Sequence, residues 1–271
     1  MVKKTVKDFY TGYGMKEWKR LARDPYHQLE IDTTMHFLNR YLPKKGLILD
    51  AGGGPGRYTI ELAKRGYDIV LLDLTPELLS IARRNIKKEG LEKKIKQIVE
   101  SSIDNLSMFD NNSFDAVICL GGPLSHLVHK KNREKAAKEL VRVAKKNAPI
   151  FVSVIGRLNV CINSTNQLYP EMLKAPDVYR KFTTTGDYFG GWGFTASHFY
   201  SPEELRAEFE HKAKILEMVG LEGMFSPIRR RYNRVYKMRK YNKILHETHL
   251  KTCTDPSIVG ISQHFMLIAR K

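Results

Sequence analysis

A glycine-rich turn follows a short apolar run near residue 50. The run, residues 47–50, has the composition of a buried strand, and the turn reads Asp50 Ala51 Gly52 Gly53 Gly54 Pro55 Gly56. Glycine allows the backbone to turn sharply and to approach a ligand closely. A strand that enters such a turn and leaves it as a helix is typical of α/β proteins, in which ligands lie beyond the carboxyl ends of the strands.

Strand and helix patterns alternate through the rest of the chain. The pattern predicts seven strands, near residues 47–51, 69–74, 95–99, 114–120, 149–155, 213–219 and 263–269. It also predicts helices near residues 57–66, 76–90, 131–146 and 202–212. This alternation predicts a doubly wound α/β fold, which is a Rossmann-like, mostly parallel sheet of seven strands with helices on both faces.

The sequence contains no internal repeat and no low-complexity linker. We therefore interpret residues 1–271 as one domain with additions. The additions are an N-terminal helical extension over 1–45 and two insertions over 156–200 and 220–260, around a regular core over 46–155. In an open α/β sheet, additions that flank the carboxyl ends of the strands are natural places for substrate recognition.

The spacing of the glycines argues against two common nucleotide sites. A dinucleotide fingerprint has a glycine three residues after Gly54, where this chain has Arg57, and a Walker loop requires a Lys followed by Ser or Thr. The turn instead resembles motif I of the class I S-adenosylmethionine-dependent methyltransferases, Asp-x-Gly-x-Gly-x-Gly. The resemblance extends to Asp73, which ends the second strand, and to residues 113–120, which resemble motif IV.

This resemblance implies that the cofactor is S-adenosyl-L-methionine and that residues 46–155 form the cofactor-binding core. The carboxylate of Asp73 is expected to accept hydrogen bonds from both ribose hydroxyls. The family often has Gly-Asp after the third strand, but this chain has Glu100 Ser101, so Ser101 or Ser102 is expected to replace the contact with the adenine. The expected cofactor-binding residues are Tyr13, Asp50, Gly52, Gly54, Asp73, Leu74, Ser102, Ile103 and Leu120.

Positive charge is concentrated in parts of the chain. The sequence has 46 Lys and Arg against 29 Asp and Glu, a formal charge of +17, and segment 229–243 contains eight cations and no acid. The spacing of Tyr232 and Tyr236 predicts a basic helix within 225–253 that buries both rings. Such a helix favours RNA contact, and a solvated Lys-rich surface is the alternative. The expected RNA contacts are Arg229, Arg230, Arg231, Arg234, Lys237, Arg239 and Lys240.

Two residues are candidates for a catalytic role. His126 follows the fourth strand, where the family often has groups that face the substrate. Trp192 lies among glycines and aromatics of the insertion 156–200, where a planar base could stack. The alternatives are a hydrogen-bonded histidine at a helix start and a hydrophobic plug at the sheet edge.

Two classes of function fit these features. The first is methylation of a base in structured ribosomal or transfer RNA. The layout and charge are similar to those of enzymes that dimethylate the exocyclic N4 of cytidine in ribosomal RNA, although Gly121 Gly122 Pro123 replaces their usual residues after the fourth strand. The second is methylation of a small molecule by an enzyme whose basic surface is incidental.

Other classes of protein are excluded. The chain has no run of about twenty apolar residues, and its start lacks the apolar region of a signal peptide, so we expect a cytoplasmic protein without a membrane partner. Cys119, Cys161 and Cys253 are too far apart for a disulfide framework or a Cys-x-x-Cys zinc site. Methyl transfer from a sulfonium requires no metal, and we expect none.

Overall fold

The computed structural model describes residues 2–167, 169–191 and 193–271 of the chain. Its main sheet has seven strands in the order β3-β2-β1-β4-β5-β9-β8. They are β1 (Leu47–Ala51), β2 (Asp68–Asp73), β3 (Ile95–Glu100), β4 (Ala116–Cys119), β5 (Pro149–Ile155), β8 (Lys214–Gly220) and β9 (His264–Arg270). The seven predicted strands and the doubly wound α/β class are confirmed.

Strand β9 runs against its neighbours. The first five strands pair in parallel, whereas β9 pairs antiparallel with both β5 and β8. Its first residue, His264, therefore lies opposite Ile155, the last residue of β5. The start of β9 is thus brought to the edge of the sheet at which the parallel strands end, and where ligands bind in this class of fold.

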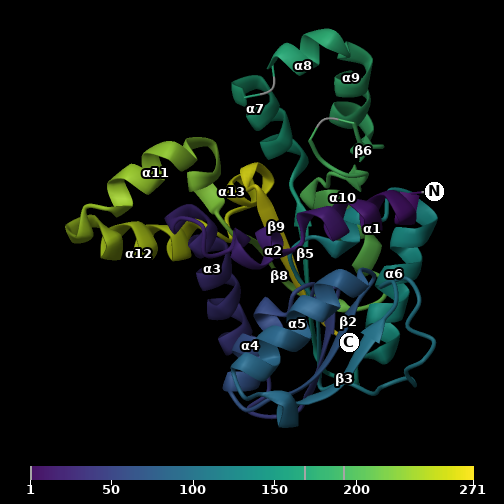
Figure 1. The fold of residues 1–271 in the computed structure, drawn as a ribbon. Coiled ribbons are helices and arrows are strands. Elements are labelled where there is room, and N and C mark those ends of the chain that lie inside the picture. The colour runs from purple at the N-terminus through teal and green to yellow at the C-terminus, as the bar shows by residue number, and fades with distance from the viewer. Residues whose placement is uncertain (1, 168, 192) are drawn as a thin grey trace.

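Four helices correspond to the predicted ones. They are α4 (Arg57–Lys64), α5 (Pro76–Lys88), α6 (Lys130–Val143) and α10 (Pro202–Phe209), each within a few residues of its expected limits. Helix α10 begins with a capping box in which Ser201 and Glu204 satisfy each other's backbone N–H groups. The helices cover both faces of the sheet (Figure 1).

The core consists of side chains that alternate between the two faces of the strands. One cluster packs under α6 and α10 and includes Leu49, Val117, Val152 and Leu267. The cluster on the opposite face includes Ile48, Ile118, Phe151 and Ile268. Cys119 is fully buried in the first cluster.

The N-terminal extension forms α1 (Val2–Tyr13), α2 (Met15–Arg20) and α3 (Pro25–Tyr41). Asp24 caps α3 by accepting a hydrogen bond from the backbone N–H of His27, and Pro25 takes the first helical position. Helices α1 and α2 cross the end of the sheet at which β5 stops and β9 starts (Figure 1). The extension therefore lies above the edge at which ligands are expected.

The first insertion also lies at this edge. It contains α7 (Arg157–Gln167), α8 (Tyr169–Lys174), α9 (Pro176–Thr185) and a small hairpin of β6 (Asp187–Tyr188) and β7 (Ser197–His198). The three helices form a lobe beyond the ends of β5 and β9, at the top of Figure 1. Within the described ranges, none of the helices combines the length and apolar character needed to cross a membrane.

The second insertion contains η3 (Gly223–Ile228), α11 (Arg229–Tyr236), η4 (Arg239–Tyr241), α12 (Asn242–Thr252) and α13 (Pro256–Ile261). The prediction of a single basic helix within 225–253 is wrong, because the chain turns back at η4. Helices α11 and α12 form an arm that projects to one side (Figure 1). Turning back allows Tyr232 of α11 and Leu245 of α12 to pack into one cluster with Tyr26.

Candidate active site

The glycine turn forms one wall of a cavity at the carboxyl end of β1. Gly52 and Gly54 have φ values of +81° and +53°, which favour glycine. The backbone N–H groups of Gly52 and Gly53 both donate to the carbonyl of Leu72, at 2.7 and 3.1 Å. These bonds tie the turn to β2, so the turn and the end of β2 form one rigid wall.

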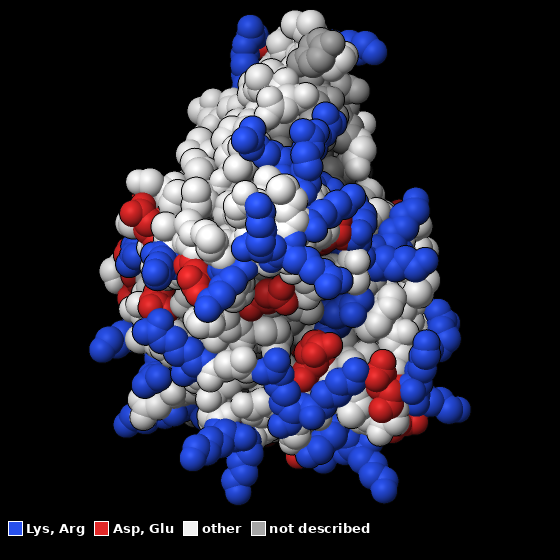
Figure 2. Space-filling view, turned by 90° about the vertical axis from the view of Figure 1, so that its left-hand side faces the viewer, with Lys and Arg blue, Asp and Glu red and all other residues white. Residues whose placement is uncertain are grey.

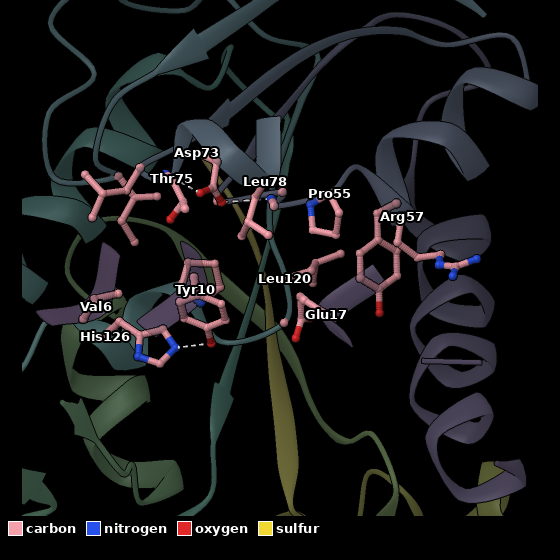
Figure 3. A pocket seen from close by; sticks show the side chains of 18 of the residues that line it. Val6, Tyr10, Glu17, Pro55, Arg57, Asp73, Thr75, Leu78, Leu120 and His126 are labelled. Carbon is pink, nitrogen blue, oxygen red and sulfur yellow. Dashed lines mark hydrogen bonds between the residues drawn. The ribbon is translucent and has the colours of Figure 1, made fainter. Parts of the chain in front are cut away.

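Asp73 ends β2 and faces this wall. Its two carboxylate oxygens accept hydrogen bonds from the backbone N–H of Gly54 (2.9 Å) and of Thr75 (2.8 Å). Figure 3 shows the carboxylate beside the glycine turn, with Thr75 and Leu78 on the same side of the cavity. Each oxygen has a second lone pair, so the carboxylate can also accept from ribose hydroxyls, as the resemblance implies for this position.

Asp50 lies behind the turn and does not line the cavity. One of its oxygens accepts from the hydroxyl of Thr59 at 2.6 Å, and the other, Oδ1, is buried without a hydrogen-bond partner among the described residues. Burial raises the pKa of Asp50 to about 7. The carboxylate therefore links β1 to α4 behind the turn. The glycine turn separates Asp50 from the cavity, so Asp50 can affect a bound cofactor only through the turn.

The cavity has a volume of about 110 Å³. Seven of the nine expected cofactor-binding residues line it, and Asp50 and Tyr13 do not. The chain also contributes residues outside the expected set, among them Val6 and Tyr10 of α1 and Glu17 of α2 (Figure 3), together with Arg20 of α2. The expected residues on the wall are Gly52, Gly54, Asp73, Leu74, Ser102, Ile103 and Leu120.

His126 lies at the border of the cavity, at the end of η2 (Pro123–His126). Its Nε2 is 2.8 Å from the hydroxyl of Tyr10, drawn as a dashed line in Figure 3, and its Nδ1 is 3.2 Å from the carbonyl of Ala196. Burial lowers its pKa to about 4, so the ring is neutral and connects α1 to the first insertion. The other candidate, Trp192, lies outside the described residues.

A second cavity, of about 350 Å³, adjoins the first; we call it the chamber. Four residues line both cavities and mark the passage between them: Tyr10, Glu17, Arg20 and Gly121. Aromatic side chains from α1 and from the first insertion line the chamber, and the rings of Phe9 and Phe194 meet edge-to-face at 5.6 Å. Tyr13 lies here, against Phe9.

A buried cluster of charges lies at the floor of the chamber. The guanidinium of Arg20 bonds both oxygens of Glu30, at 2.5 and 3.1 Å. The Nδ1 of His264 is 2.6 Å from Glu222 and 3.5 Å from Glu30. Glu222 also accepts from the backbone N–H of His264 and from the hydroxyl of Ser262. The carboxylate oxygens are thus occupied by hydrogen bonds, and we interpret the cluster as an ion-pair network.

The expected RNA contacts occupy the arm of α11 and α12. Arg229 differs from the others, because it lines the chamber and pairs with Asp24 at 3.1 Å. The other six are exposed, and Figure 2 shows many Lys and Arg side chains and few acids on the face toward which the arm points. Tyr232 is buried against Phe225, so it is a core residue of the arm.

Affinity for the cofactor is expected to fall as the pH is lowered through about 6. Burial raises the pKa of Asp73 to about 6, although the N–H groups of Thr75 and Gly54 act in the opposite direction. A carboxylate accepts stronger hydrogen bonds from the ribose hydroxyls than a protonated carboxyl group does, so we expect the ionised form of Asp73 to bind the cofactor more tightly. The stability of the free protein depends on pH in the opposite direction. The pKa of Asp73 is higher in the folded than in the unfolded protein, so the free energy of unfolding decreases as the pH rises from about 4 to 6.

Calorimetric titration with S-adenosylhomocysteine between about pH 5 and 8 measures this dependence. The variant Asp73→Asn cannot ionise at this position and is the control, which also separates the effect of Asp73 from that of Asp50. A wild-type affinity that did not change with pH would contradict the prediction.

Comparison with known proteins connects the core to a family. Residues 48–147 match the family described as "Methyltransferase domain". The chain is 33% identical over 121 residues to a glycine/sarcosine N-methyltransferase of Parasynechococcus marenigrum (strain WH8102), a match that covers 43% of this chain and 41% of that protein. It is 26% identical over 133 residues to a ubiquinone biosynthesis O-methyltransferase of Xanthomonas axonopodis pv. citri (strain 306), covering 49% and 53%. The chain thus spans about half or less of the length of these relatives.

Solved structures match over more of the chain. An S-adenosylmethionine-dependent methyltransferase of Methanosarcina mazei superposes with a TM-score of 0.59 at 21% identity, covering 87% of this chain and 96% of that one. One from Clostridium acetobutylicum gives 0.59 at 13% identity, covering 94% and 96%. Likeness at this level of identity shows the fold alone. Together with the strand order, it shows that the chain has the class I methyltransferase fold, and residues 48–147 of that fold match a methyltransferase domain.

Proposed function

We propose that this protein transfers a methyl group from S-adenosylmethionine to a small molecule that binds in the chamber. The observation that carries the proposal is the chamber itself, which adjoins the cofactor cavity at Gly121 and has a volume of about 350 Å³. Sites for small molecules have volumes of roughly 300–1,000 Å³. Helix α1 and the first insertion cover the chamber, as expected for a site that encloses its substrate.

The walls of the chamber suggest the chemistry of the acceptor. One side carries aromatic rings, among them Phe9, Tyr13 and Phe194, which favour a planar ligand. At another part of the wall, the guanidinium groups of Arg23 and Arg229 share the single carboxylate of Asp24. Guanidinium donors left over from this pairing favour an anion. We therefore infer a planar acceptor that carries an acidic group.

The relatives are consistent with a small-molecule acceptor. The names of the glycine/sarcosine and ubiquinone-biosynthesis enzymes specify small molecules as substrates. In this proposal the seven lining residues identified from the sequence bind the cofactor, with Asp73 on its ribose. Tyr10 and Gly121 line the passage through which the methyl group moves.

The cofactor supplies an electrophilic methyl group on a sulfonium, with a neutral thioether as leaving group. The protein has to align the acceptor with the methyl–sulfur bond and to exclude water. The aromatic wall fixes the plane of the acceptor, and Arg23 and Arg229 fix its acidic end. Phe9 and Phe194, which meet edge-to-face at the wall of the chamber, would limit the access of water to the bound acceptor.

Transfer of labelled methyl from S-adenosylmethionine tests the proposal. The acceptors are a panel of hydroxybenzoates, aminobenzoates, glycine and sarcosine, with total RNA in a parallel reaction. We expect label in one or more panel compounds. Label confined to a nucleoside of the RNA would overturn the small-molecule proposal in favour of the RNA alternative.

A specific observation keeps RNA as a second candidate. Six exposed cations of the arm, including Arg230, Arg234 and Lys237, have no ion-pair partner among the described residues. Unpaired cations on a projecting element attract phosphates. In this candidate the arm binds structured RNA and the acceptor is a base, with the cytidine exocyclic amine as the first to test.

Reversal of Arg230, Arg234 and Lys237 to Glu distinguishes the two functions. If the acceptor is a small molecule, the triple variant keeps wild-type methyl transfer to the panel compound. If it is RNA, binding weakens by at least tenfold and the salt dependence of the affinity becomes shallower, because fewer counterions are released. Reversal of Arg83, Lys87 and Lys88 of α5, also exposed, is the control for net charge. Binding of labelled RNA at several salt concentrations gives both quantities.

A further inference from the structure

We propose that His264 is the proton acceptor of methyl transfer, with Glu222 as the residue that positions its ring. This inference rests on the proposed function, because it assigns a role in the chamber to a histidine that the resemblance does not include. The acceptor atom is then an O–H or N–H group that loses its proton as it is methylated. The steps below concern the place of His264, its orientation, its charge and the reaction.

The direction of β9 brings His264 to the chamber. Because β9 is antiparallel to β5, its first residue lies at the carboxyl end of the parallel strands, opposite Ile155, and both residues line the chamber. Strand β9 is two strands away from β4, after which Gly121 opens the passage to the cofactor. Two strand spacings are about 10 Å. An acceptor atom that lies between these two strand ends can therefore be near the methyl group and reach Nε2 of His264 directly or through one water.

Hydrogen bonds fix the orientation of the ring. Glu222 binds Nδ1 of His264 at 2.6 Å and the backbone N–H of the same residue at 2.8 Å. A carboxylate only accepts, so Nδ1 carries the proton in the neutral ring and Nε2 keeps its lone pair. Nε2 has no hydrogen-bond partner among the residues that the structure describes. It is also not one of the fully buried polar atoms without a partner, so it is accessible from the chamber. It is the nitrogen available to a ligand.

The surrounding charges make His264 a stronger base than an ordinary histidine. Burial lowers its pKa, but the carboxylates of Glu30 and Glu222 outweigh burial and raise the pKa above the usual 6.5. Arg20 acts in the opposite direction. Tyr26, which packs against the cluster, stays neutral because burial raises its pKa well above 10. The network therefore stabilises the imidazolium that forms when Nε2 takes a proton.

Two other groups near the passage are less suited to this role. Both ring nitrogens of His126 have hydrogen-bond partners, and its pKa is lowered to about 4. Glu17 is engaged in an ion pair with Arg20 at 2.9 Å.

His27 also lines the chamber, but both of its ring nitrogens are bonded, to Asp24 and to Arg23. Among the described residues of the chamber wall, His264 combines a free nitrogen with carboxylates behind it.

The reaction balances with these groups. The O–H or N–H bond of the acceptor breaks toward Nε2 of His264, and its electron pair forms the bond to the methyl carbon. The methyl–sulfur bond breaks, and its electrons stay on sulfur. The positive charge of the sulfonium is lost while one appears on the imidazolium, next to Glu222 and Glu30. The imidazolium returns the proton to water when the product leaves.

Histidine NMR of the protein bound to S-adenosylhomocysteine tests the orientation and the charge without any acceptor. We expect a neutral tautomer with the proton on Nδ1 and a pKa above 6.5 for His264. In Glu222→Gln the amide oxygen still accepts from Nδ1 but the charge is gone, so the pKa of His264 should fall by about one unit or more. A pKa that is the same in both proteins would overturn the role given to Glu222.

Kinetics with the panel compound that takes label tests the catalytic role. In wild type, kcat/KM should decline tenfold per pH unit below the pKa of His264. His264→Gln should lose about a hundredfold in kcat and lose this acidic limb, whereas Glu222→Gln should move the limb to lower pH. The matched control is His249→Gln, which removes a buried histidine that binds Thr33 at 2.8 Å and does not line the chamber. It should keep the wild-type profile.

Affinity for S-adenosylhomocysteine and the unfolding midpoint show whether each variant is folded. If His264→Gln is unfolded, the catalytic role of His264 is tested by the shift of the acidic limb of the kcat/KM profile in Glu222→Gln. Label in a panel compound together with an acidic limb unchanged in these variants would overturn this inference and leave the proposed function intact. Absence of label from every compound with wild-type protein would overturn both.

Discussion

Gly52→Ala is expected to destabilise the protein by roughly 2–5 kcal/mol and to abolish measurable cofactor binding. Gly52 has a φ of +81°, which costs other residues about 1–2 kcal/mol. A Cβ atom at this position would also lie 2.4 Å from Cγ of Pro123, a neighbouring ring that lines the same cavity. Overpacking of this kind adds roughly 1–3 kcal/mol.

The comparison with Gly66→Ala separates the two causes. Gly66 also has a positive φ, +95°, but a Cβ atom there would have no neighbour within 4 Å. This control should lose about 1–2 kcal/mol and retain full affinity for S-adenosylhomocysteine. Chemical denaturation and calorimetry measure both quantities. Equal losses of stability in the two variants, with binding preserved in Gly52→Ala, would contradict the close approach of the turn to Pro123.

Asp73→Ala is expected to weaken binding of S-adenosylmethionine by on the order of 1–3 kcal/mol, or roughly 5- to 150-fold. Two effects contribute to the loss. The cofactor loses a charged acceptor for its ribose hydroxyls, and the N–H groups of Gly54 and Thr75 lose theirs. The second effect loosens the turn that contacts the rest of the cofactor. Isothermal titration with S-adenosylmethionine measures the change.

The control for this change is Asp68→Ala, at the opposite end of the same strand. Asp68 is half-buried and pairs with Lys94 and Lys96 at 3.7 and 3.3 Å, far from the cavity. Surface pairs contribute about 0–1 kcal/mol, so stability should change little and cofactor affinity should not change. If Asp73→Ala bound the cofactor like the wild type, Asp73 would not belong to the site.

The fold was predictable because its signals are local. The apolar runs and the turn at Gly52 lie within a few residues of each other, and Thr75 with Pro76 marks the start of a helix. The prediction failed for the arm, since periodicity alone does not show that Tyr232 and Leu245 pack into the same cluster. Tyr26, about two hundred residues earlier in the chain, supplies part of the surface against which the two helices pack, and tertiary packing of this kind overrides local propensity.

The site was predictable only in part, for a related reason. The expected cofactor residues other than Tyr13 lie at the ends of β1, β2, β3 and β4 in a known motif order, and seven of the nine expected residues line the cavity. The contact between Glu222 and His264 joins residues 42 positions apart and depends on the antiparallel direction of β9. The chamber needs α1, α2 and the first insertion together. No local pattern reports such contacts, although a His at the start of the last strand is a signal worth examining.

The position of α1 has a consequence for the steps of a catalytic cycle. This helix contributes Tyr10 to both cavities and Phe9 to the chamber, and Tyr10 is bonded to His126. Val6 and Tyr10 of α1 are part of the wall of the cofactor cavity, and Phe9 and Tyr13 are part of the wall of the chamber. Entry of the cofactor and entry of the acceptor therefore both depend on the position of this one helix. A movement of α1 on the microsecond-to-millisecond timescale of active-site lids would couple the two binding steps and the release of the products.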